Sequence, residues 1–429
     1  MALRLALRLA LAFGALLLGL TAAARADGKR EKPVPAACRA IDASGAKKPR
    51  PAKVRDHDDD DDDVDDDQGI RFGLAALCAK LTGGASYSYQ TSRQTASSLP
   101  VFINRNGTVT TGGMSQSVSA NIGFELSKLT SLGIFKTTVS ADWSKSTGDG
   151  TKTGTANLSG WSVGLGGLTV GYTGTLLSFW EGDFLSSASS PGRGATTIVY
   201  EVDVDNIDMI AVGLESNLPT SPDAQTGLGK ADFSDPVYTA RWRREQDGWT
   251  WHLSGLVRRA DFSASPLLPF FQDTAAVRTG WAVSAGLKAP MSFIAADDTF
   301  NTQWTYASDA ATYLGISTDL TVYQTVVRST GPTTGWSGVA SYHHVWSEQF
   351  ESNAFASYVA VKNALLFAQP EFRTFRTGVN LFWKPVDKVK VGIEFGMVEG
   401  RFDPRGVLGL FNGAGGRAYS GYLSVGVEL

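Results

Sequence analysis

The chain has 429 residues, a formal net charge of −3 and 19% charged residues, whereas aromatic residues make up 10% and Gly occupies 47 positions. No basic excess is present, so the composition gives no support to a nucleic-acid-binding protein. The length alone would suggest two or more soluble domains, but a weakly charged chain rich in glycine and aromatic residues is typical of many all-β proteins.

Residues 1–26 predict an export signal. Basic residues precede an apolar run from Leu9 to Leu20, and Ala24-Arg25-Ala26 has the small-x-small pattern that signal peptidase cleaves. A membrane anchor is the alternative, but the run is too short to span a bilayer comfortably. We therefore expect the mature chain to begin at Asp27.

Residues 27–68 form a charged segment that holds 9 basic and 13 acidic residues. Ten of the acids lie between Asp56 and Asp67, where close carboxylates repel one another and favour a disordered, solvated periplasmic tether. Weak binding of a divalent cation or contact with another envelope component is the alternative, although the run lacks the spacing of an EF-hand. We hypothesise that it modulates cation entry or a calcium response from the periplasmic side.

Two cysteines, Cys38 and Cys78, lie in the first part of this exported chain, which suits an oxidising compartment. We expect them to form a disulfide, with two unpaired thiols as the alternative. Two cysteines alone do not make a metal site, so none is predicted from them.

Residues 372–400 show most clearly the pattern that decides the fold class. Odd positions from Phe375 to Trp383 and from Val389 to Met397 are mostly apolar, whereas the even positions are mostly polar or glycine. Strict alternation marks β-strands, because successive side chains point to opposite faces. A three-residue turn would place Trp383 beside Val389 and put both apolar sets on one face of a hairpin.

Sixteen such segments follow one another between residues 69 and 429. The expected strands span 79–91, 113–126, 133–145, 153–165, 168–180, 195–203, 207–217, 235–245, 248–260, 276–289, 293–307, 335–346, 349–362, 371–384, 388–400 and 417–429. Short connections alternate with mostly longer ones rich in Gly, Ser, Thr, Asp and Pro. This alternation is the signature of an even-stranded up-and-down barrel in an outer membrane, with both termini in the periplasm.

No convincing helical stripe follows the N-terminal region, so lipid is the expected cover for the apolar faces. A sheet in a bilayer must close on itself to pair all of its backbone polar groups. Trp249, Trp346 and Trp383 lie beside expected short turns, as in an aromatic belt at the headgroups. The predicted fold class is all-β, a transmembrane 16-stranded antiparallel up-and-down β-barrel. A soluble β-sandwich is the alternative, because alternation cannot identify the solvent.

Short motifs along the barrel region add a family resemblance. They are Gly166–Gly171 running into Leu177–Trp180, Ala240–Trp249, Gly280–Pro290, Thr305–Ala310 with Tyr313-Leu314, His344–Trp346, and Val379–Val386 followed by Gly392–Glu394. In order and spacing they resemble the alphaproteobacterial (Rhizobiales-type) outer-membrane porin family across most of residues 70–400. The family's two N-terminal cysteines lie close together, whereas a long charged insertion separates Cys38 from Cys78 here.

This resemblance implies a trimeric, sixteen-stranded channel whose loop after the fifth strand folds into the lumen. By position that loop is residues 181–195, and its acids would face basic groups of the wall to set a transverse field and a size limit. The candidates for this pore constriction are Glu181, Asp183 and Arg193 on the loop, and Arg241, Arg243, Arg373 and Lys390 on the wall. The alternative for each is an ordinary hydrated charge of the lumen or the loop.

The sequence gives no convincing catalytic residue, cofactor site or metal site. Gly160-Trp161-Ser162-Val163-Gly164 matches the G-x-S-x-G string of esterases, but that motif needs a strand, a sharp turn and a helix, and here it falls within an expected strand. Sixteen strands leave a water-filled lumen, and transport through it needs no catalysis.

The sequence therefore predicts a non-enzymatic porin of the Gram-negative outer membrane, a homotrimer surrounded by lipid and lipopolysaccharide that lets small hydrophilic solutes and ions diffuse passively. A substrate-selective channel is the nearest alternative. The others are a barrel enzyme acting on lipid, with His252 or His344 beside a serine, and an envelope anchor whose working part is the Asp run.

Overall fold

The computed structural model describes residues 70–74, 77–95, 112–148, 151–186, 188–192, 194–204, 207–217, 232–262, 276–315, 332–362, 371–403 and 414–428. The expected signal peptide (1–26), the charged segment (27–68) and Cys38 lie outside these residues. None of the described residues belongs to a helix that is long and apolar enough to cross a membrane.

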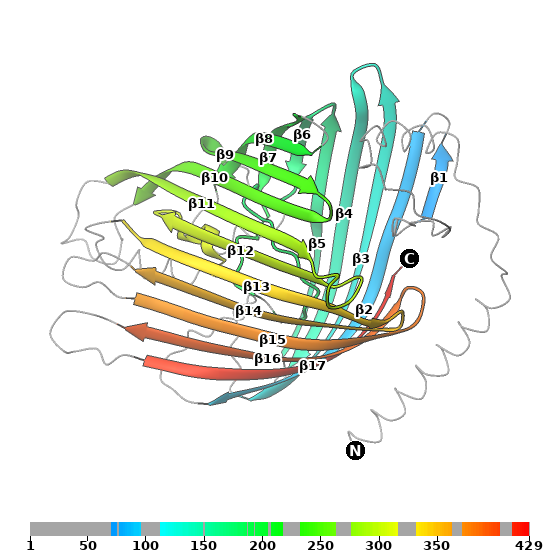
Figure 1. Cartoon of the computed structure of the whole chain (residues 1–429), viewed down its shortest axis with the longest axis vertical. Coiled ribbons are helices and arrows are strands. Elements are labelled where there is room, and N and C mark those ends of the chain that lie inside the picture. The colour runs from blue at the N-terminus through cyan, green and yellow to red at the C-terminus, as the bar shows by residue number, and fades with distance from the viewer. Residues whose placement is uncertain are drawn as a thin grey trace.

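Seventeen β-strands and a short 3-10 helix make up the regular structure of the described part of the chain (Figure 1). The strands are β1 (Ile70–Leu74), β2 (Leu77–Thr95), β3 (Gly113–Thr130), β4 (Gly133–Gly148), β5 (Thr151–Leu165), β6 (Leu168–Tyr172), β7 (Thr196–Asp203), β8 (Asp208–Asn217), β9 (Asp232–Gln246), β10 (Trp249–Phe262), β11 (Ala276–Pro290), β12 (Thr299–Ser308), β13 (Thr334–Ser347), β14 (Phe350–Lys362), β15 (Glu371–Val386), β16 (Val389–Asp403) and β17 (Ala414–Glu428). The 3-10 helix η3 spans Ala311–Leu314.

Sixteen of these strands close into an antiparallel barrel. From β2 to β17 each strand pairs with the next one in the chain. The ring closes where β17 pairs with β2, from Arg417↔Thr95 to Glu428↔Gly84 (Figure 1). A closed sheet has no unpaired edge. The predicted 16-stranded up-and-down β-barrel is therefore confirmed.

The alternation pattern did not predict β1. This strand pairs with β2 from Ile70↔Leu81 to Leu74↔Leu77. At the level of β1, one edge of β2 is paired with β3, through Cys78↔Ser127. The other edge is the one that pairs with β17 higher up the strand, from Gly84 onward. β1 therefore covers the part of that second edge that β17 does not reach.

Short connections gather at one end of the barrel, as the sequence predicts. The links β3–β4, β5–β6, β9–β10, β13–β14 and β15–β16 each have two residues outside the strands. The β4–β5 link at the opposite end is an exception, since only residues 149–150 separate those strands. The segment Met291–Asp298, predicted in part as strand, is a turn in which the Met291 N–H donates to the Asp298 carbonyl at 2.7 Å.

Outward and inward side chains alternate along the strands, and the outward set is the apolar one. In β15, Val379 and Leu381 are 52% and 41% exposed, whereas Asn380 and Phe382 are 3% exposed. This is the face assignment that the period-two pattern predicts. The exposed apolar band is what a barrel in a bilayer presents to lipid.

The β15–β16 hairpin differs from the prediction in its register. Trp383 lies opposite Val391 rather than Val389, because β15 contains a bulge after Trp383 and continues to Val386. The turn is Asp387-Lys388, with Lys388 at φ 66°. The observed pairing of Trp383 differs from the predicted one by two residues. Because side chains alternate with a period of two, Trp383 and its partner still share the predicted outward face.

Tryptophans mark the short-turn end of the outer surface. Trp249 begins β10, Trp346 lies next to the end of β13, and Trp383 lies near the end of β15. All three are exposed, and Trp249 stacks on Trp251 with ring centroids 5.9 Å apart. Their positions match an aromatic girdle at the headgroup level.

An apolar cluster fills part of the barrel interior. Leu177, from the segment after β6, and Tyr313 and Leu314 of η3 have 0% exposure. They pack with inward residues of the wall, namely Val237, Leu256, Ala282, Ala307, Val359 and Val361, and with Ala310. Burial of a large apolar side chain contributes roughly 1.5–3 kcal/mol, so this cluster attaches the segment after β6 to one side of the wall.

Candidate functional site

The inner loop, residues 173–195, connects β6 to β7 and runs along the inside of the barrel. Its residues Ser187 and Arg193 lie outside the described part. The predicted strand 168–180 instead ends at Tyr172, and Gly174 follows with φ 146°, a conformation that favours glycine. The Thr173 N–H donates to the Ala195 carbonyl at 3.0 Å, so the two ends of the loop meet at the wall.

Glu215 of β8 fixes the start of the inner loop. Its carboxylate has 0% exposure and accepts hydrogen bonds from the Thr175 hydroxyl and the Leu176 N–H, both at 2.9 Å. The Tyr313 hydroxyl of η3 donates to it at 3.2 Å. Because a buried carboxylate is stable only when it is hydrogen-bonded, Glu215 holds the loop and η3 together.

Gln303 of β12 holds the next stretch of the inner loop. Its Oε1 accepts from the N–H groups of Phe179 and Trp180 at 3.3 and 2.8 Å, and its Nε2 donates to the Leu177 carbonyl at 2.5 Å. The Trp180 indole N–H donates to the Ser341 hydroxyl of β13 at 2.8 Å. Both ends of the Gln303 amide are therefore used to fix the loop backbone.

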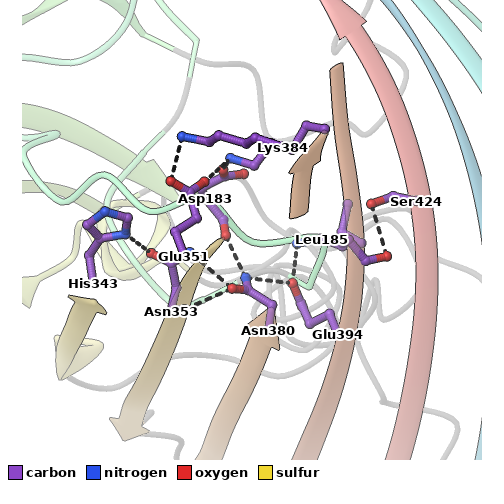
Figure 2. Close-up of polar contacts among 11 residues, drawn as sticks. Asp183, Leu185, His343, Glu351, Asn353, Asn380, Lys384, Glu394 and Ser424 are labelled. Atoms are coloured by element: carbon purple, nitrogen blue, oxygen red, sulfur yellow. Dashed lines mark hydrogen bonds and ion pairs between the residues drawn. The ribbon is translucent and has the colours of Figure 1, made fainter. Parts of the chain in front are cut away.

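A polar network on β15 and β16 holds the far end of the inner loop (Figure 2). Glu394 of β16 has 0% exposure and accepts the backbone N–H groups of Leu185 and Ser186, both at 2.6 Å. The Asn380 amide of β15 donates to the Asp183 carbonyl at 2.7 Å and to Glu394 at 3.3 Å. At this end, wall side chains therefore hold backbone groups of the loop.

The Asn380 network continues across the wall to β13. Asn380 Oδ1 accepts from the Asn353 backbone N–H at 2.9 Å and from its side-chain amide at 3.0 Å. The Asn353 Oδ1 in turn lies 2.8 Å from His343 Nδ1. Four adjacent strands, β13 to β16, therefore share one row of polar side chains under the inner loop (Figure 2).

Charged side chains face one another where the inner loop meets β14–β16. The Asp183 carboxylate forms an ion pair with Lys390 of β16. Lys390 also pairs with Glu351 of β14 at 2.6 Å, and Lys384 pairs with the same Glu351 at 2.6 Å (Figure 2). Two of the sequence candidates, Asp183 and Lys390, are therefore in contact.

A second group of charges lies on β7 and β9. Arg241 and Arg243 point inward and form ion pairs with Glu201 at 2.5 Å and with Glu245 at 2.7 Å, respectively. A cavity of about 830 Å³ lies beside them between the inner loop and β6–β7, and its lining includes Glu181, Glu201 and Arg241.

Arg373 is a correction to the candidate set. It is opposite Ala360 in the register, and its strand neighbour Phe375 is opposite Tyr358. It therefore shares the outward face with Phe375 rather than the lumen face, and it pairs with Glu371 at 2.8 Å. Because successive side chains alternate, the odd numbering of Arg373 already implied this face.

Arg193 and the predicted disulfide between Cys38 and Cys78 involve residues outside the described part of the chain. Arg193 lies outside it, so its proposed role stays a prediction. Cys78 is buried on the inward face of β2 and is disulfide-bonded. Its predicted partner Cys38 also lies outside the described residues.

Aromatic side chains and glycines fit the inner loop closely to the wall. Phe184 packs edge-on against Phe355 with ring centroids 4.5 Å apart, and Phe179 stacks on His252 at 4.9 Å. A Cβ at Gly286 of β11 would overlap the Phe179 ring. The wall is therefore shaped for this loop position.

Neither His252 nor His344, the histidines of the lipid-enzyme alternative, has the surroundings of a lipid-cleaving site among the described residues. His252 Nε2 lies 2.9 Å from the Ser254 hydroxyl, but both side chains face inward, are buried at 3% and 5% exposure, and lie under Phe179. His344 faces outward and contacts Asp298 at 2.7 Å, while the nearby Ser352 hydroxyl accepts the Trp346 indole N–H at 2.9 Å. Gly160–Gly164 lies within β5. No group of three metal-binding side chains gathers among the residues described in the structure.

The sequence pattern missed the residues that hold the inner loop. Glu215, Gln303, Asn380 and Glu394 lie at inward positions, where a polar residue looks like any other side chain wetted by a lumen. One signal was present, because Gly392 and Gly396 flank Glu394 on the same face. Glycines at inward positions leave room for another segment to approach, and Ser186 of the loop lies next to Gly396.

Comparisons with known proteins agree with this architecture. A model of the porin subfamily matches residues 75–400. No curated protein matches the chain. Among solved structures, the outer membrane channel DcaP of Acinetobacter baumannii is similar with a TM-score of 0.60 and 15% identity, over 83% of this chain and 99% of that one.

Two further structures are similar at lower scores. OprB of Pseudomonas putida at high pH has a TM-score of 0.49 and 10% identity, over 82% of this chain and 94% of its own. An anion-selective porin from Comamonas acidovorans has a TM-score of 0.48 and 8% identity, over 82% and 100%. At these identities the likeness to DcaP shows the fold alone.

Proposed function

Because the chain belongs to the porin subfamily, we propose that its outer-membrane channel is a general-diffusion pore through which small hydrophilic solutes and ions pass down their gradients. We further propose that it assembles as a homotrimer in lipid and lipopolysaccharide, and that it belongs to the alphaproteobacterial branch whose motifs it carries. The fixed inner loop is the observation that supports a size limit on the solutes.

The inner loop occupies part of the lumen, and the proposed passage runs beside it. Glu215, Gln303 and Glu394 hold the loop along one side of the wall, and cavities lie between it and the strands. Charged residues line this passage and no site for a cofactor is needed, because passive diffusion requires only water, width and a suitable field. The solutes are then selected by size and charge.

Liposome swelling tests the solute class. Purified protein in liposomes is expected to let neutral sugars enter at a rate that falls steeply with sugar size. Lipase activity on outer-membrane phospholipid is expected to be absent. Liposomes that stay impermeable to the smallest sugars, with the barrel shown to be folded, would overturn the proposal.

Planar-bilayer recording tests the trimer. A trimer is expected to close in three equal conductance steps at high voltage. A single closing step, together with the mass of one chain in detergent, would contradict the trimer and leave the channel proposal intact.

The role of the Asp run between Asp56 and Asp67 is a separate hypothesis, and the run lies outside the described residues. Deletion of residues 56–67 is expected to change the conductance or its response to calcium. Equal conductance of the deletion variant and the full chain, with and without calcium, would remove the hypothesis.

A further inference from the structure

A second cavity, of about 360 Å³, lies between the inner loop and four adjacent strands. Loop residues Glu181–Phe184 form one side. The wall contributes Lys288 from β11, Thr299 and Asn301 from β12, Ser341 and His343 from β13, and Asn353 from β14. Its volume falls at the small end of ligand pockets, which span roughly 300–1,000 Å³.

The register places the wall residues of this cavity in two rows. Asn301 lies opposite Lys288 on one side and Ser341 on the other. In the next row His343 lies opposite Thr299 and Asn353. These residues share the inward face, so the cavity has a continuous polar floor.

Two opposite charges in this cavity have no partner among the residues that the structure describes. The ion pairs described above neutralise Asp183, Lys390 and Lys384. Within the described residues, by contrast, the Glu181 carboxylate and the Lys288 ammonium make no hydrogen bond or ion pair, and both are exposed to the cavity. Unpaired charges of opposite sign in one cavity favour a ligand that carries both.

Asn301 lies between the backbone positions of Glu181 and Lys288. Its Nδ2 donates to the Glu181 carbonyl at 3.2 Å, and its own strand position is directly opposite Lys288. The loop acid and the wall base therefore lie on the two sides of Asn301. The Asn301 Oδ1 is buried and has no hydrogen-bond partner within the described residues, so Glu181 and Lys288 are the groups of this pair of positions that face the cavity.

The other end of the cavity adds an acceptor. The His343 Nδ1–H donates to Asn353 Oδ1 at 2.8 Å, so the Nε2 of the neutral ring is an acceptor, and it has no partner within the described part of the chain. The Lys288 ammonium is therefore the group that can donate to a carboxylate. The Phe184 side chain supplies an apolar surface beside these groups.

From this arrangement we propose that the cavity is a weak binding site for small zwitterions of the amino-acid class, whose ammonium group contacts Glu181 and whose carboxylate contacts Lys288. A solute with one charge satisfies one side and leaves the other charge unpaired, and a neutral solute satisfies neither. The inference deepens the proposed function and rests on it. Weak binding fits a channel, because a solute must leave as readily as it enters.

Single-channel recording with three matched probes tests the site. L-Serine carries both charges, its methyl ester carries only the positive one, and N-acetyl-L-serine only the negative one. The affinity of each probe is read from the reduction of the potassium chloride current as its concentration rises. In the wild-type channel L-serine is expected to bind roughly two- to fivefold more tightly than either derivative, the range for exposed ion pairs.

Two variants that each remove one charge test which residue contacts the ammonium group and which contacts the carboxylate. Glu181→Gln is expected to weaken L-serine and its methyl ester but not N-acetyl-L-serine, and Lys288→Gln is expected to weaken L-serine and N-acetyl-L-serine but not the ester. Glu125→Gln, which changes a carboxylate that pairs with Lys136 on the other side of the barrel, is the matched control and is expected to leave all three affinities unchanged.

Two results would overturn the site. One is equal affinity of L-serine and its derivatives in the wild-type channel, and the other is an equal loss for all three probes in either variant. A wild-type protein that conducts no current would instead overturn the channel itself, so the two failures are distinguishable.

Discussion

Asn380 and Glu394 lie opposite each other on β15 and β16, and together they bind three backbone groups of the inner loop between Asp183 and Ser186. Asn380 donates to the Asp183 carbonyl, and Glu394 accepts the N–H groups of Leu185 and Ser186. The two side chains hold the loop by backbone groups, so these contacts do not require particular side chains at Asp183, Leu185 or Ser186. The wall therefore encodes part of the loop path.

Replacement of Glu394 by alanine is expected to loosen the far end of the inner loop. The substitution removes the two hydrogen bonds from the loop to this charged acceptor, each worth about 1.5–3 kcal/mol, and leaves the Leu185 and Ser186 N–H groups without it. It also removes the hydrogen bond from the Asn380 amide. The measurable result is a larger and noisier single-channel current in a barrel that still runs as folded protein in gels. Glu399→Ala is the control, because Glu399 lies on the same strand but pairs with Arg401 and Arg417. Equal current noise in the two variants would contradict this role.

Charge substitution at the Asp183–Lys390 pair is expected to shift ion selectivity in opposite directions. Asp183→Asn makes the lumen more positive and favours anions, whereas Lys390→Met favours cations. The measurement is the reversal potential across a bilayer with unequal potassium chloride concentrations. Arg373→Gln is the control, because Arg373 faces outward. Shifts of the same sign in both lumen variants would show that the pair does not set the field.

A methyl group at Gly286 is expected to displace the inner loop. A Cβ there overlaps the ring of Phe179, which stacks on His252, and overpacking costs typically about 1–3 kcal/mol. Gly286→Ala is expected to lower the thermal unfolding temperature in detergent and to change the conductance. Gly426→Ala, where a Cβ meets its nearest atom only at 3.9 Å, is the matched control. An unfolding temperature equal to that of the control would refute the close fit.

Acid stability depends on Asp298 in the turn between β11 and β12. Burial would raise the pKa of this carboxyl, but hydrogen bonds from Tyr342, His344 and the Val345 N–H lower it below its ordinary value. A lowered folded-state pKa stabilises the barrel above the unfolded value of about 3.9, and this contribution disappears as pH falls through the folded value.

Asp298→Asn measures this contribution. Wild-type protein is expected to unfold at a higher temperature than the variant at about pH 7, and the difference is expected to shrink below about pH 4. Thermal unfolding in detergent at several pH values checks this. A difference that is constant down to about pH 3 would contradict the assignment.

The barrel could be predicted because it rests on local periodicity. Alternation along β15 and β16 gave the outward face of Val379 and Leu381, and it survived a register shift because the shift was by two residues. A sheet that spans a bilayer must close on itself to pair its backbone polar groups. The sixteen predicted strands therefore implied a closed barrel.

The inner loop could not be predicted in the same way. Leu177 and Phe179 continue the alternation after β6, and apolar residues buried inside the barrel have the same pattern as residues that face lipid. The contact of Glu394 with Leu185 joins residues far apart in sequence, and nothing local in either segment identifies the other. Arg373 was one of the wall candidates for the constriction, although its odd number places it on the outward face of β15.

Closure between β2 and β17 has a consequence for biogenesis. The first and last strands of the ring are partners, so Gly84 meets Glu428 only after all sixteen strands of the ring have been synthesised. A fragment that lacks β17 leaves two sheet edges unpaired, and these edges can pair with other chains. Such fragments should aggregate or be degraded, so insertion requires the synthesis of β17.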